Sequence, residues 1–583
     1  MATLNEVLTG MDNDVRKTSY FDLCTAICSA KYDEANAFER NAEVRLMTFA
    51  ENYGNADWGC FYGPYCADVT AEQIGYWTKR ASETKNPLLK MRYTGVVWDY
   101  CKRVTGKEPS YKDIKLAHIT SSIETVEQDL TEHSISGIVY AERSIEKAIS
   151  IRNNALTDRA IKALLSYSKK YSRDNLAGIW GRPFEFMIEH LKVFVPYEEE
   201  MLNEMLARFE RLENKSIAEG KKTDSYVHTL KEAAELLAKY YKQKRQIDKV
   251  SEYLGRYHSC MKLSFELRGA MWAHAMLQNL QQTYRNYNLT KEANKLYVEI
   301  QALGGKALDE MKPVEVSMPI DNKLIEEYFK PLLSGTDNEI LTKYMFNYLP
   351  NLEIEKRHQK HEAEYSPFMD IISTVAYNPS GIPINNVGVG KRAEEQKLSF
   401  GMCRRMKISA FFISLHIKRM EDMEVYTYDN IISLFNDSPL ILDAQRPLLE
   451  RGIKAYIDKD YVVACFILVP LFEAIIRNLA ACTGHEVLRP NGEAEEGNEY
   501  VSLEKLFNML EEDNPGDKDV YVYFKNLFTD KYGWNTRNLL CHGALAANAL
   551  NSTLADRIVH AFMLVSQMRV VSEEDEKGLD AVE

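Results

Sequence analysis

NPLLKMRYTGVVWDYCKRV, residues 86–104, carries the clearest helical pattern in the sequence. RSIEKAISIRN, residues 143–153, repeats that pattern, and alternating segments rich in valine, which are typical of sheets, are scarce. The apolar residues at helix-face spacings in these two segments are Leu88, Leu89, Met91, Val96, Val97, Trp98, Ile145, Ala148, Ile149 and Ile151. The sequence therefore predicts an all-α fold.

The composition is that of a folded globular protein. The chain has 583 residues, of which 45% are hydrophobic and 27% charged, and its formal net charge is −13. At about 150 residues per domain, three or four domains are expected. Ten cysteines are spread along the chain without a CxxC pair, so they are expected to be reduced, and neither a zinc ribbon nor a thioredoxin-like site is indicated.

No membrane segment is expected from the sequence. The longest apolar run, Tyr461–Phe472, is shorter than the ~20 residues that a bilayer span needs. The first residues, MATLNEVLTGMDNDVRK, lack the apolar stretch of a secretory signal. We therefore expect a cytoplasmic protein.

Residues 235–257 and 277–300 form a weak internal repeat with an offset of 43 residues. The matched pairs are Leu237 with Leu280, Tyr241 with Tyr284, Val250 with Ala293, and Leu254 with Tyr297. Each unit is typical of a helical hairpin of the tetratricopeptide or HEAT kind. The repeat predicts either a surface for a protein partner or an ordinary helical bundle.

Breaker residues divide the chain further. Pro, Gly and Asn cluster in residues 311–338 and again in residues 377–390, where we expect a connector or a loop covering a site. The expected domains are an N-terminal helical domain (1–195), a repeat-like segment (196–320), a connecting region (321–439), a helical bundle (440–575) and an acidic tail (576–583). The expected core of the bundle consists of Val462, Phe466, Leu468, Leu471, Ile475, Phe507, Leu510, Phe524, Leu527, Phe562 and Leu564.

Two other clusters are weak site candidates. His358 and His361, with Glu362, have a spacing that could bind a metal, but they stand among charged residues typical of a solvated helix face, so no metal site is expected. The basic residues between Lys239 and Lys249 are interrupted by acidic ones, which also favours a solvated surface.

The segment GWNTRNLLCHGALAAN, residues 533–548, carries the strongest functional signal. If a helix begins near Asn535 or Thr536, Arg537 and His542 lie ~140° apart around it, whereas Asn538 and His542 share one face. A guanidinium can bind phosphate, and a histidine can exchange a proton at neutral pH. Arg537, Asn538 and His542 are therefore the candidate catalytic residues.

A second segment, GIKAYIDKDYVVACFILVPLFEAIIRNLAACTG, residues 452–484, places two charges in an apolar helix. Glu473 and Arg477 are four residues apart, and each needs a partner because an unpaired buried charge is costly. The two residues either pair with each other at the surface or serve the site. In the second case Glu473 would orient Arg537 or His542, and Arg477 would bind phosphate.

The two segments together resemble the HEPN superfamily, and RNLLCHG resembles most closely its family of uncharacterised domains with an RNxxxHG motif. The resemblance covers roughly residues 440–575, with Pro470, Glu473 and Arg477 matching the family's apolar helix. The segment PLLKMRYTGVVWDY is similar to the helical domain that often precedes it. Many HEPN proteins are metal-independent ribonucleases, toxins or phage-defence effectors that pair as homodimers.

The resemblance implies an endoribonuclease without a cofactor, which cuts RNA through a 2′,3′-cyclic phosphate and a 5′-hydroxyl. That reaction needs a base, an acid and a cation, and one chain supplies one histidine in the motif, so a homodimer through the C-terminal domain is expected. The alternative is a non-catalytic helical adaptor or scaffold for a protein or RNA partner. Residues 441–583 contain 14 Lys and Arg against 24 Asp and Glu. Any RNA contact is therefore expected either to be confined to a narrow cleft or to need the other domains or a partner.

Overall fold

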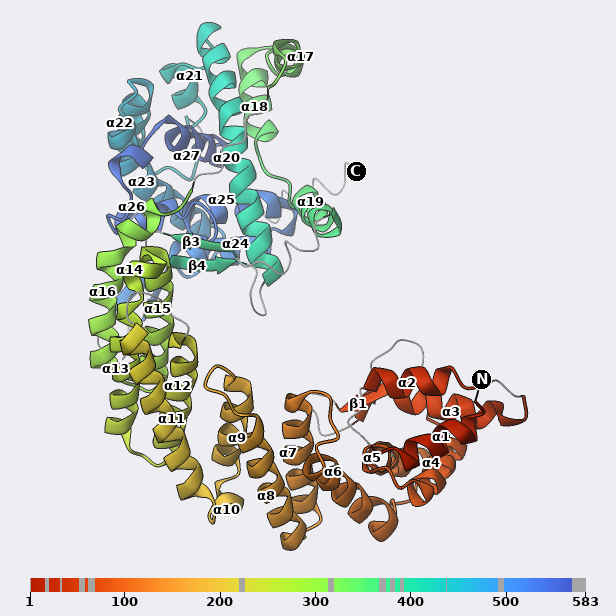
Figure 1. Cartoon of the computed structure of the whole chain (residues 1–583). Helices are drawn as coiled ribbons and strands as arrows, with labels where there is room; N and C mark the ends of the chain where they lie inside the picture. The colour runs from red at the N-terminus through yellow and green to blue at the C-terminus, as the bar shows by residue number, and fades with distance from the viewer. Residues whose placement is uncertain are drawn as a thin grey trace. The chain divides into compact units, whose positions relative to one another are not determined.

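The chain is all-α, as predicted, with short β-hairpins as its remaining regular structure among the described residues (Figure 1). The computed structural model describes residues 2–15, 20–31, 34–51, 58–60, 69–219, 226–312, 319–365, 374–377, 383–387, 393–436, 438–490 and 497–568. The acidic tail expected at 576–583 lies outside these residues. The chain divides into two compact units, residues 1–299 and 300–583, and each is described separately.

Unit 1 is a succession of helices in which sequence neighbours pack against each other. Its elements are α1 (Leu4–Asn13), α2 (Tyr20–Cys28), η1 (Glu34–Asn36), α3 (Ala37–Thr48), β1 (Phe49–Glu51), β2 (Trp58–Cys60), α4 (Ala71–Glu83), α5 (Pro87–Thr105), η3 (Tyr111–Leu116), α6 (Ala117–Glu127), α7 (Ser134–Ser150), α8 (Asn154–Tyr171), α9 (Ala177–Glu189), α10 (Leu191–Phe194), α11 (Glu198–Glu219), α12 (Val227–Gln243), α13 (Ile247–Leu263), α14 (Phe265–Arg268), α15 (Ala270–Asn286) and α16 (Thr290–Asp309), which spans the division.

Helix α5 shows why residues 86–104 form a helix. The side chain of Asn86 accepts hydrogen bonds from the backbone N–H groups of Leu88 and Leu89, at 3.0 and 3.4 Å, and Pro87 occupies the first helical position. The helix ends at Gly106, whose φ of 71° suits glycine. The apolar positions named above for this segment are buried, apart from a half-buried Trp98.

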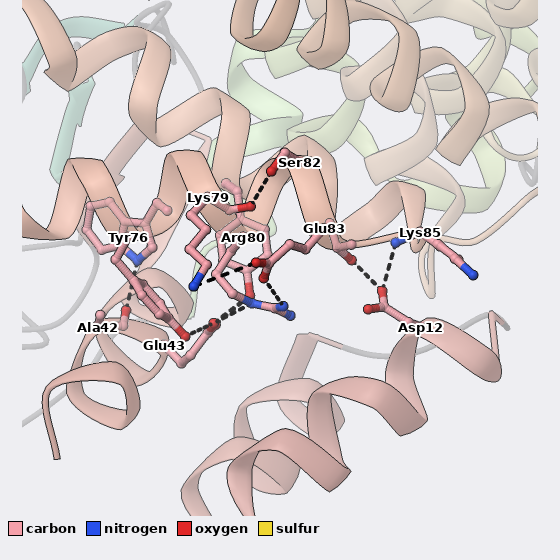
Figure 2. Close-up of polar contacts among 12 residues, drawn as sticks. Asp12, Ala42, Glu43, Tyr76, Lys79, Arg80, Ser82, Glu83 and Lys85 are labelled. Carbon is pink, nitrogen blue, oxygen red and sulfur yellow. Dashed lines mark hydrogen bonds and ion pairs between the residues drawn. The ribbon is translucent and has the colours of Figure 1, made fainter. Parts of the chain in front are cut away.

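A buried carboxylate joins three helices of unit 1. Glu43 on α3 accepts hydrogen bonds from Tyr76 and Arg80 on α4, at 2.8 and 3.3 Å (Figure 2). It also accepts one from Tyr93 on α5, at 2.6 Å. Burial raises the pKa of Glu43, and these bonds oppose the increase. Glu43 is thus fully partnered and serves the packing of α3, α4 and α5.

The internal repeat corresponds to the helical hairpins α12–α13 and α15–α16. In each hairpin the turn contains a residue with positive φ, Arg245 at 61° and Asn288 at 59°. The matched positions are buried except Tyr297, which is 41% exposed. The buried ones therefore pack the interior of the helical stack, and Tyr297 lies at its surface.

Unit 2 has a helical core with two short antiparallel hairpins, β3–β4 and β5–β6. Its further elements are α17 (Asn322–Leu332), α18 (Asp337–Asn347), α19 (Leu352–Tyr365), β3 (Thr374–Tyr377), β4 (Pro383–Val387), α20 (Ala393–Asp422), α21 (Tyr428–Ser433), α22 (Arg446–Ile457), α23 (Tyr461–Cys482), β5 (Leu488–Pro490), β6 (Asn498–Tyr500), α24 (Leu503–Asp513), η5 (Pro515–Asp517), α25 (Lys518–Phe528), α26 (Thr536–Cys541), η6 (Ala547–Ala549) and α27 (Ser552–Val565). Residues 377–390, expected as a connecting loop, contain β4.

One hydrophobic core runs through unit 2 from Ile340 on α18 to Val565 on α27. It includes Met402, Met406 and Ile413 of α20, so it extends across the limit that the sequence suggested near residue 440. The expected core residues are buried except two: Val462 and Phe466 are 43% and 54% exposed, and their assignment to the core was wrong. The sequence of α23 is apolar on nearly every face, so its pattern did not identify the exposed one.

Helix α23 is the one helix among the described residues that is long and apolar enough to cross a membrane, with a mean hydropathy of 2.0. The apolar run ends at Phe472, where Glu473 follows, but the helix continues to Cys482 and has 22 residues. Half of its most apolar stretch is buried, where it packs against α22, α24 and α27. A core helix of a folded domain satisfies the same criterion, so length and composition alone do not assign a membrane role to α23.

The buried carboxyl of Asp556 on α27 should make the stability of the protein depend on pH. Burial raises its pKa from 3.8 to about 6, although the Tyr456 hydroxyl donates a hydrogen bond to it at 2.7 Å. Because the folded-state pKa is the higher one, the contribution of Asp556 to stability should be greatest below pH 4 and fall by about 3 kcal/mol as the pH rises through 6.

Asp556→Asn keeps an acceptor for Tyr456 and removes the charge, so the variant should be more stable than the unmodified protein at pH 8 and similar to it at pH 4. Urea unfolding at both pH values measures this difference. Asp443→Asn, at a fully exposed carboxylate, is the matched control. An Asp556→Asn protein that gains no stability at pH 8 would contradict the prediction.

Candidate functional site

The candidate site is built on α26, a six-residue helix that packs against α23 and α25 (Figure 1). Helix α26 begins at Thr536, as the sequence predicts. Asn535, which precedes it, has a φ of 52° and does not cap the helix through its side chain. The backbone N–H of Trp534 donates to the carbonyl of Asn526 at 2.7 Å, which fixes the start of α26 against the end of α25.

Arg537 projects from α26 onto α23, where it forms a two-pronged ion pair with Glu473. Its Nε lies 2.7 Å from Oε2 and its Nη2 lies 3.3 Å from Oε1 of that carboxylate. The hydrogen bond to Glu473 is the main cause that raises the pKa of Arg537 above its ordinary value. Parallel hydrogen bonds of this kind fix the direction of a guanidinium as well as its charge.

Arg477 shares the same carboxylate. Its Nη2 donates to Oε1 of Glu473 at 2.8 Å, and its Nη1 donates to the carbonyl of Val501 at 2.9 Å. Its guanidinium also lies over the ring of Tyr500, 4.7 Å from the ring centre. Glu473 therefore pairs with Arg477 and also orients Arg537, so both contacts expected from the sequence occur together.

Asn538 holds the turn at the start of α26. Its side-chain nitrogen donates to Oδ1 of Asn535 at 2.8 Å, and its oxygen accepts a hydrogen bond from Nη1 of Arg537 at 3.2 Å. These contacts support the predicted role of Asn538 in the turn. The link from Asn538 to His542 is the backbone bond of the helix, at 3.0 Å.

His542 is the first residue after α26, and it is exposed. Within the described part of the chain its imidazole makes no hydrogen bond or ion pair. It is therefore accessible to a molecule in solution. The structure thus brings Arg537, Asn538, Glu473 and Arg477 into one connected cluster, with His542 at the far end of the short helix.

A cavity of about 480 Å³ lies beside this cluster and is lined by Asn535 and Asn538. Neither Arg537 nor His542 lines it. The charged residues that line it are of both signs: Glu395, Glu504, Asp530, Lys525 and Lys531. Ion pairing with Glu511 further reduces the free positive charge, because Lys525 contacts that carboxylate directly. This cavity is not an electropositive cleft.

The weaker candidates of the sequence gain no support. His358 and His361 lie on α19 with exposed side chains, and the side chain of Glu362 lies outside the described residues. In the described part of the chain, no group of three His, Cys, Asp or Glu side chains is placed to hold a metal.

The basic cluster around the α12–α13 turn is largely neutralised by acidic neighbours. Lys239 pairs with Glu185 and Glu189, at 2.8 and 3.0 Å. Lys244 pairs with Glu198 at 2.5 Å, and Lys249 with Glu252 at 2.8 Å. It is a solvated, ion-paired surface.

Sequence reasoning missed the backbone of residues 533–535. A Cβ on Gly533 would meet the carbonyl of Asn526, so this position accepts only glycine without displacement. The sequence Gly-Trp-Asn between two helical segments was the available signal, since glycine and asparagine tolerate tight approaches and positive φ. The carbonyl of Val501, which binds Arg477, left no signal in the sequence.

Comparison of the chain with models of known protein families gives no match, and comparison with curated protein sequences gives none either.

Proposed function

We propose that the chain is a cytoplasmic endoribonuclease of the HEPN type, which cuts RNA through a 2′,3′-cyclic phosphate, needs no metal, and serves as a toxin or a phage-defence effector. One observation carries the proposal: Glu473 and Asn538 hold the guanidinium of Arg537 in a fixed direction on the short helix that ends at His542. The RNxxxHG motif and its resemblance to HEPN domains support the choice of reaction.

In the proposed reaction, His542 exchanges a proton with the RNA. The 2′-hydroxyl loses its proton as its oxygen attacks the neighbouring phosphorus, and the 5′-oxygen leaves and takes up a proton. Arg537 and Arg477 supply positive charge to the crowded phosphate. Because α26 has only six residues, we do not assign an anion site to its N-terminus. The positive charge that stabilises the phosphate would come from the two arginine side chains.

The proposed enzyme is a homodimer, since two proton transfers are needed and each chain provides one His542 in the motif. The exposed face of α23 is the surface that we assign to the partner copy. Val462, Phe466 and Pro470 follow one another at four-residue spacing on it, and the same face continues to Glu473 and Arg477. We call Val462, Phe466 and Pro470 the apolar stripe. Because it leads directly to Glu473 and Arg477, pairing of two stripes across a two-fold axis would bring the charged clusters of both copies together.

The proposal is tested with purified full-length protein and a mixture of cellular RNAs, with and without a chelator of divalent metals. We expect cleavage in both reactions, and fragments ending in a cyclic phosphate and beginning with a 5′-hydroxyl. Cleavage that disappears with the chelator, or fragments that carry a 5′-phosphate, would refute the proposed reaction.

A second candidate function, a non-catalytic adaptor or scaffold for a protein or RNA partner, is favoured by one observation. Each nitrogen of the Arg537 guanidinium already has a partner in Glu473 or Asn538. A cation engaged in this way can serve stability alone. Absence of cleavage on any RNA by correctly folded protein would favour this candidate.

Phe466→Glu should dissociate the proposed dimer, because it places a carboxylate in the middle of the apolar stripe. We expect a dissociation constant at least about tenfold higher, measured by light scattering across a dilution series. Val195→Glu, at a position in unit 1 that is 66% exposed, is the control. A Phe466→Glu protein with unchanged mass at every concentration would exclude this face as the interface.

A further inference from the structure

A second cavity of unit 2, of about 440 Å³, is lined by residues of α17, α18, α19 and α20. Its floor is formed by Tyr348, Met402 and Met406, which are buried, and its rim carries the exposed side chains of Leu324 and Tyr328. Its size and largely apolar lining are those of sites for small molecules. It does not include the residues of the proposed ribonuclease site.

A buried arginine stands directly behind the wall of this cavity. Arg557 on α27 is fully buried, and its Nη1 donates to the carbonyl of Tyr348 at 3.3 Å. Its Nη2 donates to the carbonyl of Met406 at 3.0 Å and to the hydroxyl of Ser409. All three acceptors belong to residues that line the cavity.

The charge of Arg557 lacks a carboxylate partner among the described residues. Its Nε is buried without a hydrogen bond, and the neighbouring Asp556 is bonded instead to the hydroxyl of Tyr456. The other guanidinium at the cavity, that of Arg405, already pairs with the buried Glu355. The other neighbours of Arg557 are the ring of Tyr523, whose centre lies 5.9 Å from the guanidinium, and the charge of Asp556, which it does not contact by a hydrogen bond. Arg557 is therefore a buried cation next to the cavity with no carboxylate of the described residues bonded to it, and burying such a charge is costly.

We propose that this cavity binds a small molecule with an apolar, preferably aromatic, body and a single carboxylate. The carboxylate would lie at Ser409, whose hydroxyl accepts from Arg557 and would donate to the ligand in place of the carbonyl of Met406, to which it donates at 3.2 Å. The body would pack on Tyr348, Met402 and Met406. A monoanion matches the one guanidinium beside the cavity that has no carboxylate of the described residues bonded to it. A phosphate group, which needs several donors, fits this mostly apolar lining less well. The inference is independent of the proposed ribonuclease function.

The first test uses the unmodified full-length protein and two probes of equal shape, naphthylacetate and naphthylacetamide, in titration calorimetry. We expect the acid to bind at least about tenfold more tightly than the amide, as for a hydrogen bond to a charged group. Equal affinity would show a merely apolar cavity and would overturn the proposal. Absence of binding by both probes would overturn it as well.

The second test locates the site. Leu324→Glu adds a negative charge at the rim and should weaken naphthylacetate binding at least about tenfold. Ile408→Glu is the matched control, because Leu324 and Ile408 are both 60% exposed and Ile408 does not line the cavity. Equal loss in both variants, or loss in neither, would exclude this cavity.

Arg557→Met addresses the source of the preference. It should abolish the preference for the acid over the amide while the amide still binds. A retained preference in this variant would overturn the role of Arg557. Should this variant fail to fold, the comparison of acid and amide on the unmodified protein still decides between a charged and a neutral site.

Discussion

His542→Ala is expected to lower the rate of RNA cleavage by at least about 100-fold, because it removes the side chain proposed to exchange protons with the RNA. The imidazole is exposed and makes no side-chain bond within the described residues, so its removal should leave the stability of the protein unchanged. Single-turnover cleavage and thermal unfolding measure the two effects separately.

Arg537→Ala should cause a loss of similar size, since it removes charge from the phosphate. Arg537→Lys is the informative companion, because it keeps the charge but cannot reproduce the two-pronged contact with Glu473. Its activity should lie between that of Arg537→Ala and that of the unmodified protein. Activity within a few-fold of the unmodified protein in both His542→Ala and Arg537→Ala would end the assignment of this site.

Gly533→Ala is expected to destabilise unit 2 by about 3 kcal/mol. The added Cβ would meet the carbonyl oxygen of Asn526, with the carbonyl carbon and Cα of that residue at 2.9 Å. Backbone atoms cannot turn away as a side chain can. The hydrogen bond from Trp534 to the same carbonyl would be lost with the displacement, and α26 would move with it.

Gly516→Ala is the control for this substitution, because a Cβ there meets nothing within 4 Å. Urea unfolding followed by circular dichroism should show a lower midpoint for Gly533→Ala and an unchanged one for Gly516→Ala. Equal midpoints in the two variants would mean that the close approach at Gly533 is not required.

The helical class and the contact partners of Glu473 could be predicted from the sequence. Apolar spacing identified the helices, and the cost of an unpaired charge required partners for Glu473 and Arg477, which the structure places with Arg537. These predictions rest on local spacing and on charge balance, which a single sequence contains.

Other features depend on contacts between distant segments and could not be predicted. The exposed side of α23 is set by which helices pack on it, so Val462 and Phe466 could not be distinguished from buried neighbours such as Leu468. The core extends past residue 440 because α20 packs against α25 and α27, a contact between segments far apart in the chain. The charge of Arg557 behind a cavity is likewise visible only in three dimensions.

Helix α20 sets the distance between two hydrogen-bonded contacts of unit 2. Near one end, Ser399 donates to Asp530 at 2.6 Å and accepts from Asn526. Asn526 lies on α25, where its carbonyl holds the start of α26. Ten residues later Ser409 meets Arg557, about 15 Å along the same helix. Inserting one residue between the two serines would rotate one end against the other by about 100°, so both contacts could not persist. The spacing of Ser399 and Ser409 is therefore a length constraint on this chain, independent of the chemistry at either end.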